Sequence, residues 1–146
     1  MANIQAKDLM KEAPRSPKVK LGGMMILGRC IDKGRATING TNGLYNFDCP
    51  LDNRLLGFLN VKGSDLKAYI AEGHTDEEIA AWVKENGTKK TDAEVEVWNK
   101  EMEADNYSTK PPEKKAWLEG ENKRLGLDTD GTLFDFLEAD DKASFK

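Results

Sequence analysis

The side chains best suited to chemistry lie in one stretch of the 146-residue chain, from Pro14 to Asn60. This stretch contains both cysteines and four of the five arginines. One cysteine, Cys49, directly precedes Pro50, and proline favours the first position of a helix. A thiol at the start of a helix feels the positive end of the helix dipole, which favours its nucleophilic thiolate form. A capping or half-buried structural thiol is the more common role for such a cysteine.

The same stretch contains charged and polar side chains that predict a site for an anion. Guanidinium groups suit carboxylates and phosphates, and a tyrosine hydroxyl can donate to the same anion. The glycines Gly22, Gly23 and Gly28 leave room for a ligand to approach the backbone. The residues expected to line this ligand-binding site are Arg15, Arg29, Asp32, Lys33, Arg35, Tyr45, Cys49 and Asp52. A solvated charged face is the more common outcome for such runs, and it is the alternative interpretation.

Metal and cofactor chemistry has little support in the sequence. His74 is the only histidine, and two widely separated cysteines give no zinc-binding spacing. The run from Asp128 to Gly131 resembles part of a calcium loop, but Leu137 would then stand where such a loop needs its bidentate glutamate. We therefore expect no metal and no cofactor, and we assign no catalytic residue.

Helices are expected to position these side chains. Met24, Leu27 and Ile31 fall on one face of a helix predicted from Met24 to about Gly34, and Cys30 belongs to the same apolar face. The charged side chains of this helix lie on another face, where Asp32 is expected to orient a neighbouring arginine, either Arg29 or Arg35.

A second helix is predicted to begin at Cys49 or Pro50, because an apolar stripe follows at helical spacing. Between the two helices, Asn39-Gly40 and Asn42-Gly43 are turn signals. The short runs beside these turns predict one short β-hairpin around residues 37–47.

Two helix starts in the second half of the chain share the pattern T-D-x-E-[IV]-x-x-W-x-K. Thr75 and Thr91 each stand three residues before a glutamate, which is the pattern of a capping box. A last helix is predicted from Leu133 to Glu138, and the polar residues after it are expected to be frayed. These elements together predict a small all-α domain of four to seven helices over residues 1–146, with the tryptophans in its core.

Charge divides the chain into a basic half and an acidic half. Residues 1–60 contain nine basic and five acidic side chains, whereas residues 61–146 contain thirteen basic and twenty-one acidic ones. The simpler interpretation is that the halves attract each other, and the functional one is that the basic half receives an anion. A pI of about 5.2 argues against nucleic-acid binding. Without a long apolar run or a leader-like segment, a cytoplasmic location away from membranes is expected.

The sequence resembles an uncharacterised bacterial family known as domain of unknown function 5069. The words that carry the resemblance are PRSP (14–17), LGG (21–23), I-D-K-x-R-A (31–36), G-x-Y-x-F (43–47), CPLD (49–52), TDEEIAAWVKENG (75–87) and LFDFLEADD (133–141). The resemblance covers nearly the whole chain and implies a mostly helical domain. It implies no activity.

Three functions fit these observations. The leading expectation is a cytoplasmic module that binds a small anionic metabolite between the PRSP arm and the first helix. The second is a small enzyme that uses Cys49 or Asp52. The third is an interaction domain without a pocket, which forms a homo-oligomer. A pocket enclosing Arg29, Lys33 and Tyr45 would favour the first two functions over the third.

Overall fold

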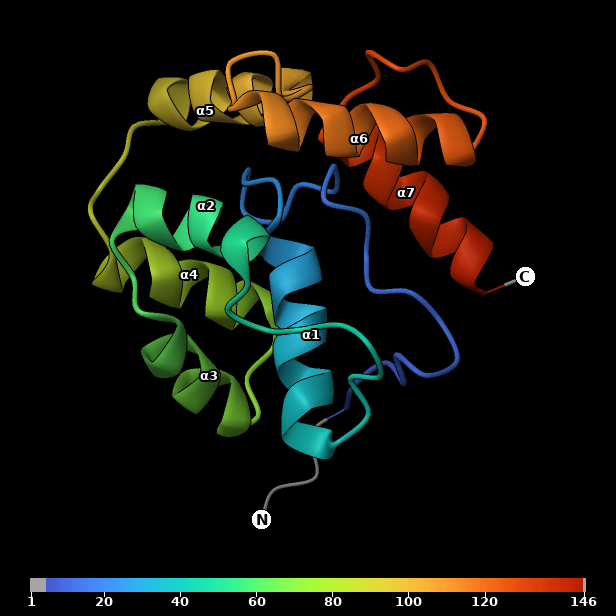
Figure 1. Ribbon diagram of the computed structural model, residues 1–146. Helices are drawn as coiled ribbons and strands as arrows, with labels where there is room; N and C mark the ends of the chain where they lie inside the picture. The colour runs from blue at the N-terminus through green and yellow to red at the C-terminus, as the bar shows by residue number, and fades with distance from the viewer. Residues whose placement is uncertain (1–4, 146) are drawn as a thin grey trace.

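The computed structural model describes residues 5–145, and this part of the chain forms seven helices (Figure 1). They are α1 (Leu27–Asn39), α2 (Pro50–Leu59), α3 (Gly63–Ala71), α4 (Asp76–Asn86), α5 (Asp92–Ala104), α6 (Pro112–Arg124) and α7 (Leu133–Ser144). The expected all-α class is confirmed. No strand occurs between residues 5 and 145 apart from an isolated bridge that joins Leu21 to Met24. No helix in these residues is long and apolar enough to cross a membrane.

Helix α1 is the element around which the others are arranged, and it packs against α2, α3 and α4 (Figure 1). It begins at Leu27 rather than at Met24, because the backbone of Ile26 has a φ of 74° and cannot belong to a right-handed helix. Nine of its thirteen residues are buried, and three of these nine are charged. The charged face of this helix therefore lies inside the protein.

The prediction of a β-hairpin around residues 37–47 is wrong. Helix α1 continues through Thr37 and Ile38, and the side chain of Ile38 packs against the main core. The helix ends at Gly40, whose left-handed backbone a glycine adopts without a steric penalty. Residues 40–49 form a loop that returns to the start of α2, and its Thr41 carbonyl accepts from the amide of Leu9. Asn39-Gly40 thus marks the end of a helix and not a turn between two strands.

The main core lies between α1, α2, α3 and α4, and it also includes Trp98 of α5 and Phe134 of α7. A smaller cluster of Leu118, Leu133 and Phe136 joins α6 to α7. Of the tryptophans expected in the core, Trp98 is buried there, while Trp117 is half exposed and packs edge-on against Phe136.

Both capping boxes are confirmed. The hydroxyl of Thr75 accepts from the amide of Glu78, whose carboxylate accepts from the amide of Thr75 in return. Thr91 and Glu94 make the same reciprocal pair at the start of α5. These starts fix where α4 and α5 begin, and α4 brings Asp76 to the side of α1.

Candidate functional site

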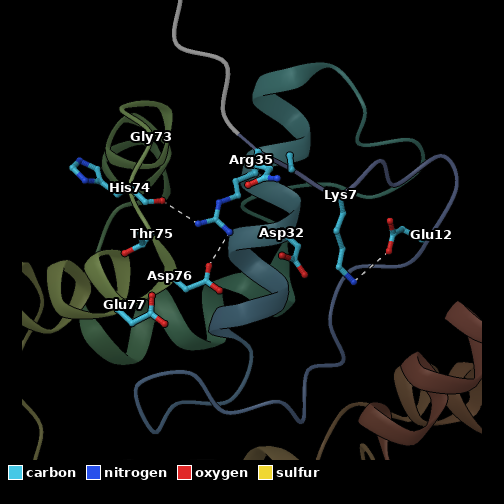
Figure 2. A pocket seen from close by; sticks show the side chains of 11 residues that line it. Lys7, Glu12, Asp32, Arg35, Gly73, His74, Thr75, Asp76 and Glu77 are labelled. Atoms are coloured by element: carbon cyan, nitrogen blue, oxygen red, sulfur yellow. Dashed lines mark hydrogen bonds and ion pairs between the residues drawn. The ribbon is translucent and has the colours of Figure 1, made fainter.

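The eight residues expected at the anion site lie on two sides of α1. On one side is a cavity of about 780 Å³, called here the thiol pocket, whose lining includes Arg29, Lys33, Tyr45 and Cys49. On the other side is a cavity of about 620 Å³, called here the charged cleft, whose lining includes Asp32 and Arg35 (Figure 2). Arg15 lines neither cavity, and Asp52 is fully buried next to Lys33. One helix thus supplies charged groups to two separate places.

The polar floor of the thiol pocket is built around the ammonium group of Lys33. Its Nζ lies 2.9 Å from Asp52 Oδ1 and 3.2 Å from Cys49 Sγ. The side chains of Lys33 and Asp52 are 4% and 0% exposed. The other Asp52 oxygen accepts from the amide of Asp48 at 2.9 Å. A buried cation is thus shared between a carboxylate and a thiol.

The start of α2 places Cys49 in this arrangement. Pro50 is the first residue of the helix, and Cys49 is its N-cap, with an extended backbone (φ −83°, ψ 173°). No side chain caps this helix. Within residues 5–145 the amides of Leu51 and Asp52 have no hydrogen-bond partner. The thiol therefore stands at a helix N-terminus whose donors are unused.

A second polar cluster in the thiol pocket is formed by Arg29, Tyr45 and Asp141. The guanidinium group of Arg29 donates twice to the Asp141 carboxylate, at 2.7 and 3.2 Å. The Tyr45 hydroxyl donates to the same carboxylate at 2.8 Å. Burial, reinforced by Asp141, raises the pKa of Tyr45 well above its usual range. The hydroxyl therefore remains a donor at neutral pH.

Asp141 is the residue that the sequence analysis missed, and the expectation of a frayed end after Glu138 is wrong. Helix α7 continues to Ser144 and presents Asp141 to Arg29, which packs this end of the chain against α1. Phe134, Leu137 and Asp141 follow one another at spacings of three and four, so they share a helical face. Extending the apolar periodicity by one turn would have found Asp141.

The walls of the thiol pocket are mostly apolar. They come from the N-terminal residues, the 40–49 loop, α2 and α7, and the apolar lining residues are Leu9, Met10, Leu44, Leu51, Leu137 and Phe145. Leu44 is 98% exposed and Met10 is 60% exposed, so the rim of the pocket consists of apolar side chains that are exposed to solvent. The pocket therefore combines a polar floor with an apolar mouth.

The charged groups of the other side form what we call the guanidinium clamp: Arg15, Asp32, Arg35 and Asp76. Arg15 donates to Asp32 from its backbone amide at 2.8 Å and from Nε at 3.1 Å, and to Asp76 from Nη1 at 2.9 Å. Arg35 donates to Asp76 at 2.8 Å and to the carbonyl of His74 at 3.0 Å (Figure 2). Two cations and two carboxylates thus satisfy one another.

The clamp corrects two expectations about this region. Asp32 binds Arg15, and neither Arg29 nor Arg35 is its partner. Gly28 does leave room for a close approach, but the group that approaches is the Arg15 guanidinium: a Cβ at Gly28 would lie 3.2 Å from Arg15 Nε. Both arrangements follow from the proline-flanked arm (residues 14–17), which passes beside α1 and carries Arg15 against it.

The acidic half of the chain supplies the partners of the basic half. Asp76 and Asp141 pair with Arg15 and Arg29, and Asp135 and Glu138 of α7 both pair with Lys18. Burial alone would raise the pKa of Asp76, but Arg15 and Arg35 together outweigh burial and hold that pKa below its usual value. The basic residues of the first half and the acidic residues of the second half are thus largely used in ion pairs with each other.

The described residues hold no cluster of three or more side chains that would suit a metal ion. The polar groups at the thiol pocket are Lys33, Cys49, the Leu51 amide and the Arg29–Tyr45–Asp141 cluster.

Comparison with known families gives one result. A family model described as a domain of unknown function (DUF5069) matches residues 11–143, a range that includes both sides of α1 and Asp141. No curated protein matches the chain.

Proposed function

The chain belongs to the DUF5069 family, a domain of unknown function, and from the geometry of the thiol pocket we propose that it binds a small, singly charged anion with an apolar body. The observation that carries the proposal is a buried ammonium group, Lys33, at the floor of a cavity whose walls are apolar. A volume of about 780 Å³ suits a ligand of metabolite size.

The donors available at the floor suit a carboxylate. An ammonium group has three donors, and only the Cys49 sulfur accepts a hydrogen bond from Lys33, while Asp52 forms an ion pair with it. The unpartnered amide of Leu51, a residue that lines the pocket, lies at the start of α2, where a helix favours negative charge. The buried Nε of Arg29 also lacks a partner in the part of the chain that the structure describes. These groups provide more donors than the protein's own acceptors use.

The charge balance limits the ligand to a single negative charge. Arg29 and Lys33 line the pocket, but Asp141 already offsets Arg29 and Asp52 offsets Lys33. Asp140, which also lines the pocket, pairs with Arg124. A phosphate dianion would meet these carboxylates without a surplus of positive charge. A monocarboxylate brings one charge to the end of the pocket that holds Lys33 and the start of α2.

The apolar body of the ligand is expected to lie against α7 and the rim. Leu137 and Phe145 line the wall, and Leu44 extends from the loop into solvent. Covering such exposed hydrocarbon is favourable by about 25 cal/mol per Å² of apolar surface. A straight-chain acid of medium length meets both requirements.

Calorimetric titration with octanoate, octanol and octyl phosphate tests this proposal. We expect octanoate to bind more tightly than either of the others, because only it combines one negative charge with an apolar chain. Equal binding of octanol would show that the floor does not recognise an anion. Absence of binding by all three would overturn the proposal.

Two exposed apolar residues provide a matched test of where the ligand binds. Leu44→Asp replaces an apolar rim residue by a charge, whereas Val97→Asp makes the same change on α5, where the side chain is 57% exposed. We expect Leu44→Asp to weaken octanoate binding about tenfold, which corresponds to ~1.4 kcal/mol. Val97→Asp should bind as the wild type does. Equal affinities of the two variants would exclude the thiol pocket as the binding site.

A further inference from the structure

We propose that Cys49 is a nucleophile that accepts an acyl group from an activated ester or thioester, and that water then releases the acyl group as the carboxylate which the pocket binds. This inference rests on the proposed function, because the bound monocarboxylate is the product of the reaction. It goes beyond that function in assigning a reaction and a catalytic residue.

Three features of its surroundings suit Cys49 to nucleophilic attack. Lys33 donates to its sulfur at 3.2 Å, and the thiol is at the N-cap of α2, at the positive end of the helix dipole. Cys49 is only partly buried and lines the pocket, so a substrate can reach its sulfur.

The second cysteine provides an internal contrast. Cys30 is fully buried in the main core. Burial, followed by the negative charge of Asp52, raises the pKa of the Cys30 thiol well above its usual value. The two thiols therefore differ in access, and only Cys49 can be reached by a substrate in the pocket.

The unused amide of Leu51 suits the charge that develops during acyl transfer. When a thiolate attacks a carbonyl carbon, negative charge builds on the carbonyl oxygen, and backbone donors are the usual groups that stabilise it. The amide of Leu51, which lines the pocket, follows Cys49 in sequence by two residues and has no partner within residues 5–145. An uncapped helix start beside a nucleophile is the arrangement that this step needs.

The reaction balances without an oxidant or a metal. The Cys49 sulfur forms a bond to the acyl carbon, and the leaving thiolate or phenolate departs with the electron pair of the broken bond. Water then adds to the acyl carbon, the carbon–sulfur bond breaks, and the thiolate of Cys49 is restored. The carboxylate leaves the pocket, and two protons pass to solvent.

The apolar mouth of the pocket indicates the class of acyl group. Leu137 and Phe145 of the wall and Leu44 of the rim suit an unbranched hydrocarbon chain. The substrate class is therefore an activated medium-chain acyl ester or thioester, with its chain along α7 and its carbonyl at Cys49.

The test uses p-nitrophenyl octanoate with the full-length protein. We expect a burst of p-nitrophenolate equal to one equivalent of protein, and an octanoyl mass increase on the peptide that contains Cys49. Acylation of Cys30 instead, or absence of any acyl–protein adduct under conditions that give no burst, would overturn the inference. Peptide mapping of the acylated wild-type protein shows which cysteine carries the acyl group, so this test needs no variant.

Variants of Cys49 and Lys33 then separate a role in the reaction from a role in the fold. Cys49→Ser should lose the burst while still binding octanoate. Lys33→Arg should retain acylation, whereas Lys33→Met should slow it, because Lys33 donates to the Cys49 sulfur. Iodoacetamide labelling of Cys49 should slow in the same variant in the absence of substrate. An unchanged labelling rate in Lys33→Met would remove Lys33 from the mechanism.

The two proposals fail in different ways. Octanoate binding without acylation of Cys49 would overturn the inference and leave the binding function in place. Acylation of Cys49 in a protein that does not bind octanoate would contradict the binding function, because the product would then have no site.

Discussion

The two sides of α1 contain the same kinds of charged side chain and use them in different ways. In the guanidinium clamp, Arg15 pairs with both aspartates and Arg35 pairs with Asp76. In the thiol pocket, the cation of Lys33 is shared between an aspartate and a thiol next to an open cavity. The number of basic residues is the same on the two sides. Both sides have a cavity, and what distinguishes the thiol pocket is a buried cation next to a thiol and apolar walls.

The two sides also differ in burial. The side chains of Lys33 and Asp52 are 4% and 0% exposed, whereas those of Arg15 and Asp76 are 24% and 27% exposed. Breaking a buried pair leaves an uncompensated charge in a medium of low dielectric constant, whereas a partly exposed charge can be solvated again. The pocket side should therefore respond more strongly to single substitutions than the clamp side does.

The largest effect is expected from Asp52→Ala. This change leaves the buried ammonium group of Lys33 without its carboxylate and should lower the free energy of unfolding by about 3–5 kcal/mol. Urea unfolding measures the loss. The double variant Lys33→Met with Asp52→Leu should regain most of it, because no buried charge remains. If the double variant is no more stable than Asp52→Ala, the uncompensated charge of Lys33 is not the source of the loss.

Arg15→Ala should have a smaller effect, on the clamp side. It removes hydrogen bonds to two carboxylates, Asp32 and Asp76, and interactions with charged groups contribute about 1.5–3 kcal/mol. Urea unfolding should show this loss, and the iodoacetamide reactivity of Cys49 should stay at the wild-type level. A change in Cys49 reactivity would mean that the two sides of α1 are coupled.

The clamp should also be visible in the dependence of stability on pH. The pKa of Asp76 is lower in the folded protein than in the unfolded chain, so this group stabilises the fold when it is ionised. The contribution is present above the unfolded pKa of about 3.9 and is lost as pH falls through the lower folded pKa. Asp76→Asn should therefore be less stable than the wild type at pH 7, and the difference should shrink below about pH 4. A constant difference from pH 7 to pH 3 would contradict the assignment.

The smallest effect is expected at the helix caps. Thr75→Ala and Thr91→Ala each remove a capping-box hydroxyl and should cost about 0.5–2 kcal/mol in thermal or urea unfolding. Thr75 directly precedes Asp76 of the clamp, whereas Thr91 lies away from both sides of α1. A larger loss at Thr75 than at Thr91 would show that the clamp depends on the start of α4.

Local signals in the sequence predicted much of the helical fold. The capping boxes at Thr75 and Thr91 and the proline after Cys49 mark helix starts through interactions within three or four residues, so they can be read directly. The turn signal at Asn39-Gly40 was misread as part of a hairpin because a glycine ends helices and turns alike.

The candidate site was less accessible to sequence reasoning. Apolar periodicity places hydrophobic side chains inside, but it does not show that Arg29 and Lys33 are buried as well. Their burial depends on carboxylates that lie elsewhere in the chain, Asp141 for Arg29 and Asp52 for Lys33. No local pattern links such partners, so the eight predicted residues appeared as one basic surface rather than as two separate clusters.

The distance in sequence between Arg29 and Asp141 also has a consequence for the order in which the protein is made. These residues are 112 positions apart, whereas Arg15 and Asp76 are 61 apart. At about 5–20 residues per second, Asp76 follows Arg15 after roughly 3–12 s of synthesis, and Asp141 follows Arg29 after roughly 6–22 s. The clamp can therefore close on the growing chain while Arg29 still faces water. The thiol pocket, which needs Leu137 and Asp141, is completed only when α7 emerges.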